Sequence, residues 1–319
     1  MGLTPLKYRK YFQIKNKRSW YSNANYLDRG KNSMEIKILD TYNLYKELIN
    51  LPKENRLEFY ESNLAKPFEF MYNIMNMKME PEMMGYLPLN GHDDEINDML
   101  NMLQEENAWS MAKEALEESA ERFKNINIDL PESITLGIFI GNPEFLANMK
   151  GYTGMGSIPG YIQIVIAPNE YNLPRLKSII AHEFHHNVLM KNVKWNFMNV
   201  SVSQYIALEG LAESFAASLY GDEFIGPWVT SVQGKDLEKS FEIIGDALDI
   251  TGFNEVRKYV FGDQLVNVEG CESTGIPVSA GYAVGYHAVQ GFLKNTGISV
   301  EEATLIDSDI IMKKSGCFI

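Results

Sequence analysis

The sequence predicts an α+β protein in which a small sheet is followed by a mostly helical second half. Two runs rich in β-branched residues, 134–140 and 161–167, indicate strands. Most of the other segments carry apolar residues at helical spacing. The chain has 319 residues and is 45% apolar, which is enough to bury the core of one large domain or of two moderate ones.

The region before residue 130 is expected to be mainly helical. An alternating run at 34–39 predicts a strand. The pattern from 40 to 77 is helical, with breaks at Pro52 and Pro67. After a turn-rich joint, the apolar spacing predicts one long amphipathic helix over 93–124.

A glycine-rich loop at 151–160 joins the two strand-like runs of the second half. Helices are then expected at 174–190, 201–220, 235–249, 252–261 and from Ser279 onwards. We therefore divide the chain into a basic arm at 1–33 that is expected to be disordered, a helical region at 34–130 and a third region at 131–319.

Charge and cysteine content narrow the possible partners. The net charge is −13, of which residues 1–33 contribute +7 through eight Lys or Arg and one Asp, and the rest of the chain −20. An acidic body repels phosphate backbones, so we expect no nucleic-acid partner. No apolar run of about 18 residues is present, so we expect no membrane span. Two cysteines make no disulfide framework, which predicts a reducing, cytoplasmic location.

The segment AHEFHHNVLM, residues 181–190, places titratable groups in an otherwise apolar helix. His182 and His186 are four residues apart, so their Cβ atoms would lie about 5–6 Å apart and both rings could bind one metal ion. Imidazole nitrogens suit zinc. Glu183 projects about 100° further round the helix, where it can take a proton from water without binding the metal. His185 could also reach a metal, but the four-residue pair places Glu183 better, so His185 is expected to be a supporting or capping group.

The next helix offers a third ligand. Glu209 and Glu213 share one face of an apolar helix, so both are expected inside the protein, where a carboxylate needs a cation or donors. Either can bind the metal, and the other can accept a hydrogen bond from a metal-binding imidazole. We assign Glu209 as the ligand, because Gly210 beside it allows close approach to the 174–190 helix, and Glu213 as the supporting group. Three protein ligands leave a position for water, as in catalytic zinc sites.

Together these motifs resemble those of a known family. HEFHH followed by EGLAE resembles the pattern of the gluzincin zinc metallopeptidases. More narrowly, HEFHH, EGLAESF and GYAVGYHAVQ together are similar to the YjaZ-like family of predicted zinc-dependent proteases. The similarity covers residues 130–295. It implies a thermolysin-like zincin core, with 131–319 as the catalytic region, a Zn²⁺ cofactor and a peptide or protein substrate. Glu183 would act as general base.

The same resemblance implies two further parts of the site. Gluzincins commonly place a Tyr or His donor opposite the metal to stabilise the oxyanion. Tyr282 is the first choice for this role and Tyr286 the second, and the alternative is that both tyrosines only pack in the core. An edge strand beside the metal pairs with the extended substrate in this group, and the run 161–167 is the candidate.

Two other functions fit the sequence. A non-catalytic binding or chaperone-like module could keep a structural zinc, with His185 or Cys271 as a fourth protein ligand. A hydrolase of a non-peptide amide would use the same residues as a peptidase. The sequence defines neither the cleavage preference nor the oligomeric state.

Overall fold

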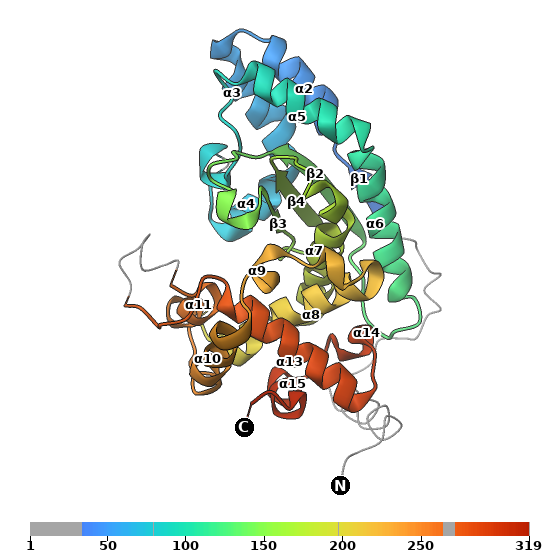
Figure 1. Ribbon diagram of the computed structural model, residues 1–319. Helices are drawn as coiled ribbons and strands as arrows, with labels where there is room; N and C mark the ends of the chain where they lie inside the picture. Colours follow the sequence, from blue (N-terminus) through green and yellow to red (C-terminus); the bar gives the residue numbers. More distant parts are fainter. Residues whose placement is uncertain (1–33, 79, 197, 264–271, 319) are drawn as a thin grey trace.

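A four-stranded sheet lies in the middle of the fold, with helices on both of its faces (Figure 1). The computed structural model describes residues 34–318 apart from residues 79, 197 and 264–271. The strands are β1 (Glu35–Ile38), β2 (Ser133–Ile140), β3 (Tyr152–Met155) and β4 (Tyr161–Ile166). Their order is β1-β2-β4-β3; the first three run parallel, and β3 is antiparallel to β4 at the edge. The expected α+β class is confirmed.

The helices of the N-terminal half are α2 (Thr41–Asn50), α3 (Arg56–Phe59), α4 (Glu69–Met75), α5 (Asp93–Glu105) and α6 (Ala108–Arg122). The single helix expected over 93–124 is wrong, because the chain breaks between α5 and α6. Asn107 adopts a left-handed conformation there, with φ of +54°. Asparagine tolerates this conformation better than most residues, and its neighbours Glu105 and Glu106 are exposed rather than packed in the core.

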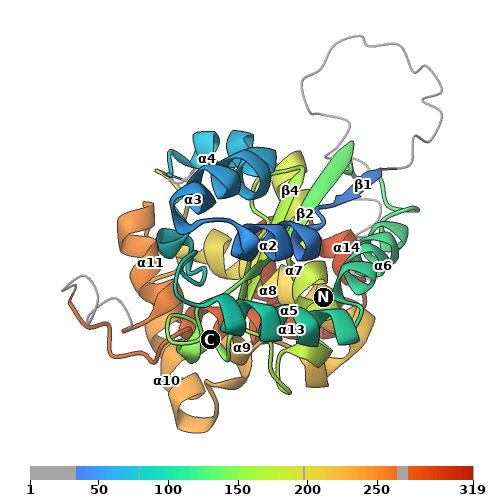
Figure 2. The ribbon, with the colours of Figure 1, turned by 90° about the horizontal axis from the view of Figure 1, so that it is seen from above.

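The two faces of the sheet are covered by different parts of the chain (Figures 1 and 2). On one face, the rings of Phe68 and Phe70 pack against Tyr161 of β4, and Tyr72 of α4 hydrogen-bonds Gln163. The other face supports α7. β1 comes from the expected 34–130 region and pairs with β2 of the expected 131–319 region. That division stays a prediction, and the arm at 1–33 lies outside the described residues.

The C-terminal half is helical. Its helices are α7 (Leu176–Asn192), α8 (Val202–Tyr220), α9 (Pro227–Thr230), α10 (Gly234–Gly245), α11 (Phe253–Phe261), α13 (Ala280–Thr296), α14 (Val300–Ala303) and α15 (Ser308–Ser315). A capping box between Ser201 and Gln204 starts α8, and Gly221, with φ of +103°, ends it. The segments after α13 carry α14 and α15, which the sequence pattern did not predict.

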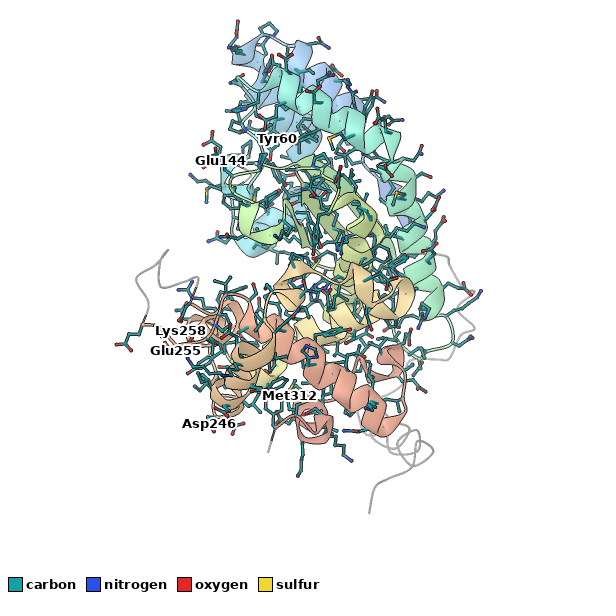
Figure 3. The ribbon with its side chains drawn as sticks, in the orientation of Figure 1. Tyr60, Glu144, Asp246, Glu255, Lys258 and Met312 are labelled. Atoms are coloured by element: carbon teal, nitrogen blue, oxygen red, sulfur yellow. The ribbon has the colours of Figure 1, made fainter. Side chains whose placement is uncertain are left out.

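Buried side chains form a continuous core through both halves. It extends from Tyr60, among the N-terminal helices, to Met312 on α15 (Figure 3). Over the described part of the chain, no helix has both the length and the apolar character needed to cross a membrane.

Candidate metal centre

Helix α7 carries polar groups through the protein interior. From Ser178 to Leu189 every residue of this helix is buried, the three histidines and Glu183 included. Titratable side chains are costly at such positions unless they have partners. Each of them has a different environment, and together they define the site.

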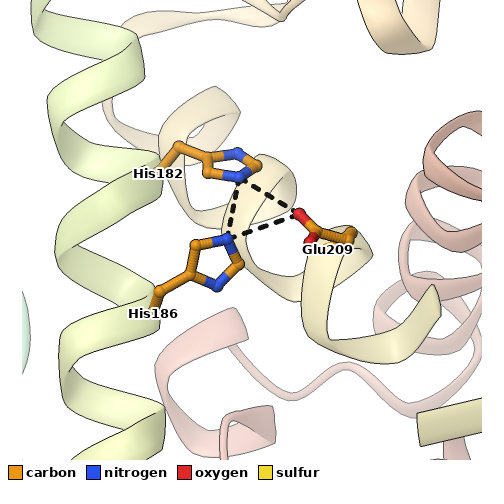
Figure 4. Close-up of side chains that lie close together, drawn as sticks. All are labelled: His182, His186 and Glu209. Atoms are coloured by element: carbon orange, nitrogen blue, oxygen red, sulfur yellow. Dashed lines mark hydrogen bonds and ion pairs between the residues drawn. The ribbon is translucent and has the colours of Figure 1, made fainter. Parts of the chain in front are cut away.

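His182 and His186 turn their Nε2 atoms toward Glu209 of α8 (Figure 4). The two Nε2 atoms are 3.0 Å apart, and Glu209 Oε2 lies 3.4 Å from the first and 3.3 Å from the second. Ligand atoms at about 2.0–2.1 Å from a tetrahedral zinc ion are separated by about 3.3–3.4 Å. The three side chains therefore fit a zinc ion in spacing, in donor type and in burial.

Glu213 fixes the orientation of the first histidine. Its Oε2 lies 2.8 Å from His182 Nδ1. A carboxylate oxygen only accepts, so Nδ1 donates, and the lone pair of Nε2 is left free for a metal. Among the described residues, His186 Nδ1 is buried and has no hydrogen-bond partner.

The charges around the centre favour a cation. Burial opposes a charge on His182, but Glu209 and Glu213 outweigh it and raise the pKa of this imidazole well above its usual value. Burial also opposes a charge on Glu209, yet the two imidazoles lower the pKa of its carboxyl to about 2. The Glu209 carboxylate therefore carries a negative charge inside the protein. A buried negative charge needs a positive partner, and a divalent cation can be that partner.

Glu183 lies beside the ligands, against the edge strand. A Cβ on Gly154 of β3 would lie 2.4 Å from Glu183 Oε1, and one on Gly156 would lie 2.3 Å from the Glu183 carbonyl oxygen. Only glycine leaves this space. Burial raises the pKa of the Glu183 carboxyl above its usual value. The sequence pattern had marked the loop 151–160 as glycine-rich but not as the wall of this site.

The edge strand is not the one expected. β4 holds the run 161–167 and lies between β2 and β3, so it is an inner strand. The edge next to β4 is β3, which forms within the glycine-rich loop, and the opposite edge is β1. The expectation that 161–167 forms an edge strand is wrong, because strand order depends on long-range pairing. The apolar pattern of one run does not encode that pairing.

Gly210 has a different partner from the one expected. A Cβ there would lie 2.2 Å from the carbonyl oxygen of Gly285, so α8 meets α13 backbone to backbone at this point, and the expected approach to α7 is wrong. Gly281, one turn before Gly285, packs against Val260 of α11 instead. The Gly210–Gly285 contact holds α13 against the helix that carries Glu209, and the Gly281 contact holds α13 against α11.

The two tyrosines of α13 have different surroundings. The Tyr282 ring packs near Trp228 and Phe261, with centroids 6.4 and 6.2 Å away. Burial raises the pKa of the Tyr282 hydroxyl well above its usual value, and the charge of Glu209 adds to this effect. Tyr286 instead donates its hydroxyl proton to Asp222 Oδ1, at 3.0 Å.

His185 points away from the metal centre. Its Nε2 lies 3.1 Å from Thr304 Oγ1, and its ring packs 5.5 Å from that of Phe215. It is fully buried, and this burial lowers the pKa of the imidazole well below its usual value. His185 is thus bonded elsewhere and lies apart from the cluster of His182, His186 and Glu209. Cys271 lies outside the described residues.

Comparison with known proteins gives a consistent result. Residues 108–313 match the family model described as "Predicted Zn-dependent protease (DUF2268)". The chain is 38% identical over 300 residues to "Uncharacterized protein YjfC" of Bacillus subtilis (strain 168). The aligned region covers 89% of this chain and 99% of that protein. No solved structure matches the chain.

Proposed function

This chain belongs to the family of predicted Zn-dependent proteases, and we propose that it is a zinc metallopeptidase of the gluzincin type. The convergence of His182, His186 and Glu209 beside the buried Glu183 carries this proposal. The third candidate ligand comes from the helix after the H-E-x-x-H helix, as in gluzincins. The position of α7 and α8 beside a small sheet supports a thermolysin-like core.

The candidate ligands offer two imidazole nitrogens and one carboxylate oxygen. His182 and His186 would hold the ion through Nε2, and Glu209 would hold it through Oε2. A bound zinc ion supplies a Lewis acid that makes water more acidic and polarises a carbonyl group. Three protein ligands are the number found in catalytic sites, whereas structural sites use four.

Glu183 is the group that moves the proton. Its carboxylate accepts a proton from the attacking water and later delivers it to the nitrogen of the leaving amine. Burial raises the pKa of this carboxyl, which makes the carboxylate a stronger base for the first transfer. Gly154 leaves room for its carboxylate beside β3, and Gly156 leaves room for the Glu183 backbone.

Tyr282 is the better candidate for stabilising the oxyanion. Its ring packs near Trp228, which in turn packs against His182, and the charges of Glu209 and Glu183 both raise the pKa of its hydroxyl. Tyr286 is a poorer candidate, because its proton is already donated to Asp222. A donor aimed at the developing oxyanion typically contributes about 10²–10³-fold to kcat.

The strand β3 is the proposed docking edge for the substrate. It is one of the two edge strands of the sheet, the other being β1, and it lies directly against Glu183. An extended peptide can pair with such an edge through main-chain hydrogen bonds, which require no particular side-chain sequence. We therefore assign the role first given to 161–167 to Tyr152–Met155.

Several parts of the account stay predictions. These are the cytoplasmic location, the absence of a nucleic-acid partner and the preference for peptides over non-peptide amides. The same residues would serve hydrolysis of a peptide and of a non-peptide amide, so the residues do not distinguish the two substrate classes. Activity against a panel of peptides and simple amides does.

The test is cleavage profiling with the zinc-loaded full chain. A mixture of proteome-derived peptides is incubated with the natural protein, with Glu183→Gln and with Glu255→Gln, a control at an exposed glutamate of α11. We expect Glu183→Gln to lower cleavage by about 10²–10⁴-fold with unchanged zinc content, and Glu255→Gln to change neither. Equal cleavage by the natural protein and Glu183→Gln, or zinc-loaded protein that cuts nothing, would refute the proposal.

A further inference from the structure

The Glu213 carboxylate is held by three donors from two parts of the chain. Besides His182 Nδ1, Trp228 Nε1 donates to Oε2 at 2.9 Å, and the Gly226 backbone N–H donates to Oε1 at 2.5 Å. Glu213 is only 2% exposed, so these donors replace the water that the carboxylate has lost. One oxygen, Oε2, thus joins the indole of Trp228 to the imidazole of His182.

The indole is itself held in place by its neighbours. Its ring packs 5.5 Å from that of Tyr152 on β3 and 5.9 Å from that of His182, at an interplanar angle of 71° to the latter. A Cβ on Gly226 would lie 2.1 Å from the indole, so this position accepts only glycine without a shift of the ring. The ring therefore has little freedom to turn away from Glu213.

We propose that Trp228 is a positioning residue for the metal centre: through Glu213 it holds His182 with Nε2 aimed at the ion, and so sets the affinity for zinc. The inference rests on the proposed metal site but not on peptide hydrolysis. A carboxylate that accepts from both rings cannot rotate without losing one bond. Partners of this kind commonly change metal affinity by about 10–100-fold when they are lost.

Within the part of the chain that the structure describes, only one of the two candidate ligand histidines is oriented by a hydrogen bond of this kind. His182 has Glu213 on its far nitrogen, whereas His186 Nδ1 has no partner among the described residues. Orientation of the imidazole pair by hydrogen bonding therefore acts through His182. The hydrogen bond from Trp228 to Glu213 extends this support, because it holds the carboxylate that orients His182.

A matched pair of tryptophan substitutions tests the inference. Trp228→Phe keeps an aromatic ring but removes the N–H. Trp109→Phe is the control, because Trp109 Nε1 makes an equivalent bond of 2.9 Å to Thr41 Oγ1, far along the chain from the ligands. Zinc affinity of the full-length proteins is measured by competition with a chelator, and thermal unfolding is measured in parallel. We expect Trp228→Phe to weaken zinc binding by about 10-fold and Trp109→Phe to leave it unchanged.

A double-mutant cycle separates positioning from general stability. Once Glu213→Ala has removed the shared acceptor, Trp228→Phe should cost little further affinity, because both changes break the same link. Fully additive losses, or equal effects of Trp228→Phe and Trp109→Phe, would overturn the inference. If Trp228→Phe does not fold, Trp228→Leu, which also lacks a donor, is used in the same cycle with the same criteria.

The outcome is distinct from that of the peptidase proposal. Weakened zinc binding in Trp228→Phe, together with unchanged turnover in Glu183→Gln, would refute the peptidase and leave the positioning role intact. Natural protein that binds no zinc would refute both. Zinc binding that is insensitive to Trp228, together with cleavage that depends on Glu183, would refute only the positioning role.

Discussion

Gly210 of α8 and Gly285 of α13 meet with no side chain between them. A Cβ on Gly285 would lie 2.1 Å from the carbonyl oxygen of Ile206, and one on Gly210 would lie 2.2 Å from the carbonyl oxygen of Gly285. Both obstacles are backbone atoms, which cannot turn aside as a side chain can. This contact holds the helix of Tyr282 against the helix of Glu209.

We predict that Gly285→Ala lowers the free energy of unfolding by about 1–3 kcal/mol, because the helices must separate to admit a methyl group. The control is Gly245→Ala on α10, where the added Cβ would meet only the Phe318 side chain, at 3.2 Å. Chemical denaturation of both variants measures the difference. Equal stability of Gly285→Ala and Gly245→Ala would show that the backbone contact is not tight.

The assignment of Glu209 predicts the order of zinc affinities. Glu209→Gln should weaken zinc binding by more than roughly 100-fold, beyond the range of about 10–100-fold expected for the supporting residue in Glu213→Gln. His287→Ala, at an exposed histidine of α13, should have no effect. Chelator competition gives all three values. If Glu213→Gln proves the more damaging, the two glutamates have the opposite roles.

The tyrosines of α13 are predicted to separate in kinetics. Tyr282→Phe should lower kcat by about 10²–10³-fold with little change in KM, because its donor acts on the transition state. Tyr286→Phe loses a bond to Asp222 and should cost about 0.5–1.5 kcal/mol of stability, with kcat nearly unchanged. Steady-state kinetics on one cleaved peptide distinguish them. A loss of kcat in Tyr286→Phe alone would reverse the assignment.

The pair Arg56–Asp93 predicts a pH-dependent contribution to stability. The buried Arg56 binds both Asp93 oxygens, at 2.5 and 2.9 Å, and this lowers the pKa of the Asp93 carboxyl below its usual value. A carboxyl with a lowered pKa stabilises the fold fully above its unfolded pKa of about 3.9, and this stabilisation is lost as pH falls through the folded pKa. Because Asp93 is 43% exposed, the effect is modest, about 1–2 kcal/mol.

The measurement is chemical denaturation of the natural protein and Asp93→Asn from pH 7 to pH 3. The difference in unfolding free energy should be constant from pH 7 to about 5 and should shrink below about 4. A difference that persists unchanged to pH 3 would exclude the charge of Asp93 as its source.

Local features of the sequence predicted much of the fold. Runs rich in β-branched residues identified β2 and β4, and an alternating run identified β1. The four-residue spacings identified the groups that α7 and α8 bring together. These features depend on residues close in the chain, where helix and strand geometry fix which side chains share a face. Asn107 shows the limit of this approach, because a single left-handed residue divides an otherwise continuous amphipathic pattern.

Features that depend on distant residues could not be predicted in this way. The edge position of β3 depends on its pairing with β4, and the partner of Gly210 is 75 residues away, at Gly285. Trp228 carried no signal of its own, since its role arises only where α9 meets α8. The side chain of Glu213 makes that role visible in the structure.

The most direct test of the central claim is a crystal structure of the zinc-loaded full chain, with anomalous diffraction recorded at the zinc absorption edge. We predict one zinc peak at about 2.0–2.2 Å from the Nε2 atoms of His182 and His186 and from a carboxylate oxygen of Glu209, with no side chain at the fourth position. A zinc peak elsewhere, or a fourth protein ligand that closes the site, would contradict the account.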